Sequence, residues 1–232
     1  MAPTALIFIL ILISVVGTGF LYWRHIWFFR NPSRIAPLGA NIVSPADGTV
    51  VYVKTVEPKE NVIVIKQGIA AQIEDIVRQD VDSRKILIGV FMSPFNVHYN
   101  RAPLAGTIKK ITHYPPKTAN VHMGPMHFRI LFNQMPLYRN SLHILENERT
   151  VTRIKGKFRE GDISCYVVQI AGKSVHGIDT YIPEGGSVGK GEIFGMIRIG
   201  SQVDLIVPEM PEMRAKVKPG DKVKAGETIL ID

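Results

Sequence analysis

The sequence is poor in cysteine, and this excludes a fold held together by disulfides. Cys165 is the only cysteine among the 232 residues, so no disulfide can form within the chain. It lies in the apolar run "SCYVVQIAG", where a buried core thiol is expected rather than a nucleophile. This cysteine usage fits a reducing compartment. The apolar content of 46% excludes a disordered chain and allows a sizeable core.

Basic residues are missing from the start of the chain, which argues against a cleaved signal peptide. No Lys or Arg precedes Arg24, and no clear A-x-A cleavage site follows the apolar run. Residues 5–23 carry no charge, and as a helix they would span about 28 Å, close to the hydrocarbon core of a bilayer. We therefore predict one N-terminal transmembrane or membrane-embedded helix.

The residues after this run predict how the helix is oriented. Trp23 and Trp27 lie where aromatic belts form, and Arg24, Arg30 and Arg34 follow. By the positive-inside rule, the rest of the chain lies on the cytoplasmic side of the cell membrane. The expected organisation is an anchor with a basic juxtamembrane segment, residues 1–34, followed by a second domain, residues 35–232.

The net charge of +8 predicts an anionic partner. The sequence lacks a basic stripe interleaved with aromatic residues, so nucleic acid is not expected. With a membrane anchor present, contact with anionic lipid explains the charge most simply.

The second part of the chain is expected to be mainly β, in the α+β class. Gly, Pro and Asn clusters separate short apolar runs, and residues 159–162, "REGD", are typical of a hairpin turn. One helix is expected over residues 69–81. Strands are expected at 48–56, 61–67, 85–92, 106–114, 128–132, 150–158, 164–172, 192–199 and 203–208.

A weak internal repeat predicts the architecture of the core. "EGGSVGKGEIF" from Glu184 and "PGDKVKAGETI" from Pro219 share the pattern G-x-x-V-x-x-G-E. Such hammerhead-type repeats mark the turns of barrel-sandwich folds, including lipoyl and biotinyl carrier domains. A non-enzymatic, membrane-anchored module of that kind is therefore an alternative function. Its modified lysine is usually found in M-K-M or D-K-A, and Lys216 in "RAKV" is the nearest approach.

The histidines do not predict a metal site. His122 with His127, and His176 with Asp179, match no strong ligand spacing, so no metal is expected. A membrane-anchored zinc peptidase would instead require bound metal and sensitivity to chelators.

A polar segment directly follows the strand expected at residues 85–92. In "SPFNVHYNRAP", His98 and Arg101 stand three residues apart, with Asn100 between them. Asp47 precedes Gly48 in the turn "SPADGTV". Taken alone, these residues are more often structural loop residues than catalytic ones.

Gly200 and Ser201 interrupt the run "MIRIGSQVDLIVP", where neither residue favours a strand. A serine hydroxyl can attack the carbonyl of the residue before it, converting the peptide into an ester. Glycine at that position tolerates a strained backbone and leaves its carbonyl accessible. Elimination and hydrolysis then cut the chain and leave a pyruvoyl group at the new N-terminus.

Several motifs in order make this possibility specific, and together they resemble the short form of the phosphatidylserine decarboxylase proenzyme family. The motifs are "FFRNPSR", "SPADGTV", "SPFNVHYNRAP", "ENERTV", "VVQIAG" and "GEIFGMIRIGSQVDLIVP". The resemblance implies self-cleavage between Gly200 and Ser201, and a covalent pyruvoyl cofactor derived from Ser201. It also implies a heterodimer of a β chain, 1–200, and an α chain, 201–232. The implied reaction converts phosphatidylserine of the inner leaflet to phosphatidylethanolamine and CO₂.

The resemblance implies roles for the polar residues, with one departure. Longer members have H-x-x-H where this chain has His98 and Arg101, and arginine cannot act as a base at neutral pH. Asp47 and Ser201 match their catalytic positions. Because Arg101 replaces the second histidine, the base for self-cleavage is open, and His98 is a candidate for both self-cleavage and decarboxylation. His98 is expected to reprotonate the substrate carbon. Arg101 and Asn100 are expected to bind substrate, Arg101 through the phosphodiester. The lipid tails, ester or ether, and a further homo-oligomer stay open.

Overall fold

The chain forms two compact units, residues 1–32 and 33–232. The second unit contains every described strand, so the predicted mainly β class is confirmed. The computed structural model describes residues 2–58, 60–66, 69–72, 76, 82–173, 177–198 and 200–232.

The first unit is a long apolar helix. α1 spans Ala2–Tyr22 and continues as the π-helical turn η1, Trp23–Trp27. The helical segment Pro3–Trp27 is long and apolar enough to cross a membrane. Its large apolar side chains, such as Phe8, are exposed within the chain. The helix predicted over residues 5–23 is confirmed, and its surface is compatible with membrane association.

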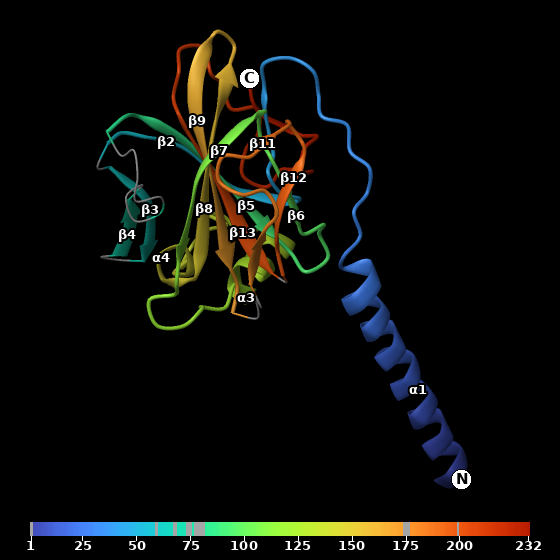
Figure 1. Cartoon of the computed structure of the whole chain (residues 1–232). Coiled ribbons are helices and arrows are strands. Elements are labelled where there is room, and N and C mark those ends of the chain that lie inside the picture. Colours follow the sequence, from blue (N-terminus) through green and yellow to red (C-terminus); the bar gives the residue numbers. More distant parts are fainter. Residues whose placement is uncertain are drawn as a thin grey trace. The chain divides into compact units, whose positions relative to one another are not determined.

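Antiparallel strands build the second unit. The largest sheet has eight strands in the order β11-β7-β8-β9-β13-β5-β2-β14, and it is curled (Figure 1). β10-β12-β6 form a three-stranded sheet, and β1-β15 and β3-β4 form pairs. The strands are β1 Ile42–Val43, β2 Gly48–Val56, β3 Asn61–Lys66, β4 Ile69–Gln72, β5 Lys85–Met92, β6 Tyr99–Arg101, β7 Gly106–Tyr114, β8 Arg149–Phe158, β9 Gly161–Ala171, β10 Ile178–Thr180, β11 Ser187–Val188, β12 Ile193–Ile197, β13 Ser201–Pro208, β14 Lys222–Val223 and β15 Ile229–Ile231.

Both faces of the eight-stranded sheet are covered, which explains the continuous apolar runs of its central strands. Successive side chains of a strand point to opposite faces. On β13, Val203 and Leu205 pack into one core with Ile88 of β5. Ile206 packs into a second core with Leu87 of β5. The alternation along β13 therefore assigns each side chain to one of two environments.

Two short helices cover the second core. α3, Gly124–Leu131, and α4, His143–Glu146, lie in the connection between β7 and β8. Pro125 occupies the first turn of α3, where an N–H has no helical acceptor in any case. Met126 of α3 and Ile144 of α4 are buried in the second core. Figure 1 shows both helices at the same end of the sheet.

The strand predicted at residues 128–132 is wrong, because most of this range belongs to α3. Met126 and Ile130, four residues apart, face the second core, as helical spacing requires. Phe128 lies on the exposed side of the helix. An apolar residue on the solvent side conceals the helical period, so the sequence resembles a continuous strand.

The helix predicted over residues 69–81 is wrong where it is described at its start. Ile69–Gln72 form β4, which pairs antiparallel with β3 directly before it. This pairing satisfies the backbone groups of both segments and overrides the helical spacing of the apolar residues. Apart from residue 76, the remainder of the range lies outside the described residues.

The other predicted strands are confirmed within a few residues, and so is the hairpin turn. Phe158 of β8 pairs with Gly161 of β9 across the turn, and Arg159 has a φ of 52°.

The repeat glycines also adopt the predicted geometry, in two matching turns that each precede an edge strand of the large sheet, β11 or β14. Gly185 and Gly220 have φ angles of 84° and 99°, and each amide donates to the neighbouring strand at 2.8 Å.

Candidate active site

Ser201 is the first residue of β13 and lies at one end of the eight-stranded sheet. It pairs with Met92, the last residue of β5, and with Ala171, the last residue of β9. Its side chain is fully buried, and its Oγ donates to the Met92 Sδ at 3.4 Å. Gly200 has a left-handed φ of 60°, and no neighbouring heavy atom would lie within 4 Å of an added Cβ. The Gly200–Ser201 peptide therefore joins a left-handed glycine, with empty space at its Cβ position, to a buried hydroxyl that forms a hydrogen bond.

Buried polar side chains lie close to this hydroxyl. The Met92 Sδ also accepts a weak hydrogen bond from the Asn100 Nδ2 at 3.8 Å, so one sulfur contacts both side chains. The Asn100 Oδ1 accepts from the Gln169 Nε2 at 2.8 Å, and both side chains are fully buried. The structure thus connects the predicted residues Ser201 and Asn100 through Met92. Gln169 was missed, although a lone polar residue in the apolar run "YVVQIAG" is a signal for it.

His98 is fully buried next to β6. Its Nδ1 lies 2.9 Å from the carbonyl oxygen of Asn96, and its own carbonyl accepts from the Ile197 N–H at the end of β12. Because a carbonyl can only accept, Nδ1 carries the proton of the neutral ring, and Nε2 carries the lone pair. The neutral ring is therefore held in the tautomer that can take up a proton at Nε2.

Asp47 lies in the turn before β2 and belongs to an ion-paired cluster. One carboxylate oxygen accepts from Arg34 at 2.9 Å, and the other accepts from the Ala225 amide at 2.8 Å. Arg34 also pairs with Glu227 at 3.2 Å. Within the described part of the chain, no hydrogen bond joins Asp47 to Ser201. The structure ties Asp47 to the juxtamembrane arginine and to the last repeat, while its catalytic role stays a prediction.

Arg101, on β6, lies beside the same cluster. Its guanidinium donates to the Gly191 carbonyl at 2.8 Å, and an added Cβ at Gly226 would come within 2.9 Å of the Arg101 side chain. Burial lowers the pKa of Arg101, and Arg34 acts in the same direction. The Arg101 side chain thus lies against two equivalent turns of the repeat, at Gly191 and Gly226, and its predicted contact with substrate stays a prediction.

The opposite face of β13 carries a second polar group that sequence reasoning missed. The Gln202 Nε2 donates to the Tyr52 hydroxyl and to the Asp204 carboxyl, both at 2.7 Å. The Gln202 Oε1 lies 2.9 Å from the His143 Nε2. Burial raises the pKa of Asp204 to about 6 and lowers that of His143 to about 4. All four side chains are almost completely inaccessible to water.

The described residues contain no group of three His, Cys, Asp or Glu side chains placed to hold a metal ion. The His122 Nδ1 accepts from the Gly124 amide at the start of α3. The His127 ring lies 6.0 Å from the Phe91 ring. The two histidines thus make separate contacts, on α3 and in the segment before it.

Comparison with known proteins decides the family. The family model for phosphatidylserine decarboxylase matches residues 21–231. The chain belongs to the phosphatidylserine decarboxylase family. The phosphatidylserine decarboxylase proenzyme of Pelobacter propionicus is 33% identical, over 88% of this chain and 74% of its own length. That of Azorhizobium caulinodans is 34% identical, over 94% and 77%. A Methanopyrus kandleri relative, provisionally named an archaetidylserine decarboxylase proenzyme, is 37% identical, over 88% and 80%.

Membership of the phosphatidylserine decarboxylase family confirms the resemblance seen in the sequence motifs. It identifies the chain as a decarboxylase and argues against the carrier-module and zinc-peptidase alternatives. Lys216, the residue considered for a carrier, forms an ion pair with Asp232 at 3.1 Å. The family model also covers Gly200, Ser201 and the segment around His98, so the candidate site lies within the shared part of the chain.

Proposed function

We propose that this chain decarboxylates phosphatidylserine to phosphatidylethanolamine and CO₂, with a pyruvoyl group made from Ser201. The observation that carries the proposal is the Gly200–Ser201 junction at the head of β13. There a left-handed glycine precedes a buried hydroxyl beside Asn100 and Gln169. The family membership and the names of the relatives supply the substrate class.

Self-cleavage follows from the chemistry of this junction. The Ser201 Oγ attacks the Gly200 carbonyl carbon, the C–N bond breaks, and the released nitrogen takes the proton, which leaves an ester. Removal of the Ser201 Cα proton expels the Gly200 carboxylate and leaves dehydroalanine. Water then replaces the nitrogen, and ammonia leaves. Open space around Gly200 and its φ of 60° support this step, because the carbonyl can turn toward the hydroxyl.

His98 is the proposed base for self-cleavage and the proposed acid for decarboxylation. Its Nδ1 contact with the Asn96 carbonyl fixes the Nε2 lone pair for proton uptake. Arg101 replaces the second histidine of longer family members and cannot serve as a base. One histidine therefore handles the proton in both reactions, which is the simplest assignment for this chain.

The buried surroundings of Ser201 fit a pyruvoyl group. A pyruvoyl carbonyl needs hydrogen-bond donors and shelter from water, and the amides of Asn100 and Gln169 lie on the same side of the sheet. When formed, the group supplies an electron sink for the leaving carboxylate. Asn100 and Gln169 orient the serine headgroup, and His98 delivers the proton to the substrate carbon. Asp47 holds Arg34 and Ala225, and so positions the turn before β2.

The two chains produced by cleavage remain joined through the sheet. β13 lies between β9 and β5 and pairs with both along most of its length. β14 and β15 of the same segment pair with β2 and β1. We infer that the β chain, 1–200, and the α chain, 201–232, form a stable heterodimer. The paired glycine turns support a barrel-sandwich core with hammerhead-type repeats, and the residues after α1 support a catalytic domain on the cytoplasmic side.

The test is turnover by the purified full chain in vesicles that contain phosphatidylserine. We expect phosphatidylethanolamine from the parent chain and none above background from Ser201→Ala. Ser187→Ala, at an exposed serine of β11, is the matched control and should keep full activity. Equal rates for Ser201→Ala and the parent would refute the proposal. Comparing ester-linked with ether-linked phosphatidylserine decides which tails are accepted.

A further inference from the structure

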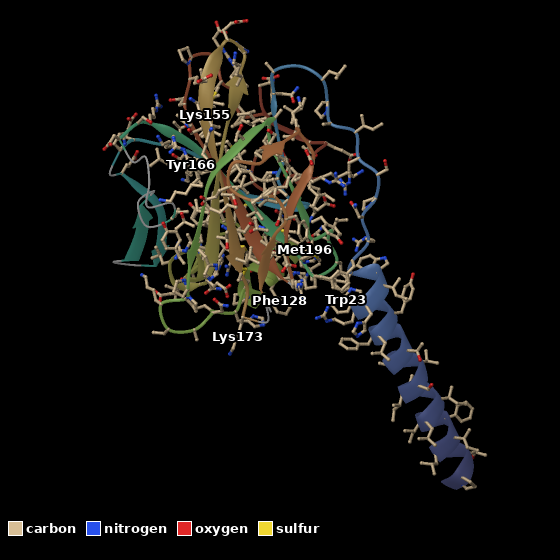
Figure 2. All side chains as sticks on the ribbon, viewed as in Figure 1. Trp23, Phe128, Lys155, Tyr166, Lys173 and Met196 are labelled. Carbon is tan, nitrogen blue, oxygen red and sulfur yellow. The ribbon has the colours of Figure 1, made fainter. Side chains whose placement is uncertain are left out.

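The end of the sheet that holds Ser201 also carries α3. β7 ends at Tyr114 and β8 begins at Arg149, and these two residues pair with each other. Arg149 pairs with Ile170, next to the Ala171 that faces Ser201. The connection between β7 and β8, which contains α3, therefore leaves and re-enters the sheet at the Ser201 end. Figure 2 shows Phe128 of α3 at this end and Lys155 toward the other.

α3 exposes large apolar side chains on the side that faces away from the core. Phe128, Leu131 and Phe132 are 61%, 66% and 64% exposed, and we call these three side chains the α3 face. Their spacing of three and four residues places them on one side of the helical turn. Met126 is buried on the other side, so α3 is apolar on both sides. Exposed apolar clusters of this kind mark interaction sites.

The charge around the α3 face selects the partner. Between Tyr114 and Glu146, the connection that carries α3 contains Lys117, Arg129 and Arg139 and no Asp or Glu. Arg129 lies on α3 itself, and Lys173 follows the strand that pairs with Ser201. Figure 2 shows Lys173 at the same end of the domain as Phe128. Aromatic and leucine side chains within a basic surround are typical of segments that bind anionic bilayers.

We propose that the α3 face inserts into the surface of the anionic bilayer that contains the substrate. It is a second membrane contact, distinct from α1, and it directs the Ser201 end of the sheet toward the lipid headgroups. The occupant is the bilayer because the substrate of the proposed function is a membrane lipid, and the inference rests on that function. A second copy of the chain would bury the same apolar side chains, but it gives no reason for the excess of positive charge.

The direct test places a probe on the α3 face in the full chain. Phe128→Cys is labelled with an environment-sensitive fluorophore, in vesicles whose lipids carry nitroxide on the acyl chain. Cys165 is fully buried and does not compete for the label. Leu38→Cys, at a side chain that is 95% exposed and lies outside α3, is the matched control. We expect strong quenching at position 128 and weak quenching at position 38.

Weak quenching at both positions would overturn the proposal, as would a blue-shifted but weakly quenched fluorophore at position 128 whose shift disappears when the chain is diluted in lipid. The second outcome would mean that another copy of the chain covers the α3 face. Repeating the measurement with Ser201→Ala separates the inference from the proposed function, because docking of the uncut chain needs no cofactor. Quenching that persists in Ser201→Ala supports docking even if no decarboxylation is found.

Activity supplies a second readout. Replacing Phe128, Leu131 and Phe132 by serine should lower turnover of vesicle phosphatidylserine by about tenfold, because the α3 face no longer holds the site at the bilayer. Turnover of a short-chain, water-soluble phosphatidylserine and the extent of self-cleavage should stay at the parent level. An equal loss on both substrates would overturn the proposal and assign the α3 face a structural role.

Discussion

The two faces of β13 carry polar groups of different kinds. On one face, Ser201 begins the strand beside Met92, Asn100 and Gln169, and a Cβ added to the preceding Gly200 would meet nothing within 4 Å. On the other face, Gln202 joins other buried side chains in hydrogen bonds of 2.7–2.9 Å. The first face joins a nucleophile to an adaptable glycine, whereas the second is a buried group linked by hydrogen bonds through Gln202.

This difference teaches how a self-cleaving strand stays in place. The bond before Ser201 has to break while the strand remains in register, and the Gln202 group fastens the strand one residue beyond the cut. The contacts of Gln202 with Tyr52 of β2 and His143 of α4 link the strand to two neighbouring elements. We therefore expect substitutions on the Ser201 face to change chemistry, and substitutions on the Gln202 face to change stability.

The largest expected effect separates two buried histidines, His98 and His143. His98→Gln removes the group proposed to accept and return the proton, so self-cleavage should slow by at least about 100-fold, as is typical when a general base is lost. His143→Gln keeps a donor toward Gln202 and should cleave within about threefold of the parent, since it acts through no reacting group. The cleaved fraction is measured over time by gel electrophoresis.

Normal cleavage in His98→Gln, combined with lost turnover, would restrict His98 to decarboxylation and leave the first base elsewhere. A block in both histidine variants, with both chains folded by circular dichroism, would contradict the division between the two faces.

A smaller effect is expected from the glycine before the cut. Gly200→Ala places a Cβ at a φ of 60°, which costs about 1–2 kcal/mol in the left-handed region, although the space is open. The backbone should shift to relieve this cost, moving the carbonyl away from the Ser201 hydroxyl and slowing cleavage by about tenfold.

Gly185→Ala is the matched control for this substitution. Its φ is 84°, and an added Cβ would also meet nothing within 4 Å. It should lower stability by a similar amount and leave the cleavage rate unchanged. Similar slowing in both variants would show that general destabilisation, rather than the geometry of the cut, limits the reaction.

The smallest expected effect is the change of folding stability with pH, measured on the uncut Ser201→Ala chain. The fold lowers the pKa of His143 to about 4, below its usual value of 6.5. The contribution of His143 to folding stability is therefore present above pH 6.5 and is lost as the pH falls from 6.5 toward 4. Asp204 has a pKa raised to about 6, so its neutral form is favoured and stability falls as pH rises from about 4 to 6. The two slopes oppose each other in the parent.

Asp204→Asn removes one of the opposing slopes. The melting temperature should then rise with pH between about 4 and 6.5 more steeply than in the parent, by an amount equivalent to a few kcal/mol of stability. His143→Gln should show the reverse trend. Parallel curves for all three chains would mean that neither group titrates as its burial requires.

Much of the fold could be predicted from the sequence, because turn residues punctuate the strands. β2, β5 and β7 have the predicted bounds, since glycine, proline or polar residues stand at their ends. The repeat glycines also predicted left-handed turns. α3 could not be predicted, because apolar residues on its exposed side conceal the helical period. β4 could not be predicted either, because its strand conformation is set by pairing with β3.

The site was predictable only in part. Ser201 and Asn100 were selected from local motifs, and in the structure both contact the Met92 sulfur. Gln202 was not selected, because its partner Tyr52 is 150 residues away in the chain. The ion pair between Asp47 and Arg34 was also unforeseen. Contacts of this kind depend on how strands meet in the sheet, which local sequence patterns do not encode.

Intact-mass spectrometry of the purified full chain, with Ser201→Ala as the control, tests the central claim most directly. The account predicts two fragments that part after Gly200, with the C-terminal fragment lighter by one ammonia than its serine-initiated mass. It also predicts a single uncut chain for Ser201→Ala. One uncut mass in both samples would contradict the account, because no pyruvoyl group would then exist.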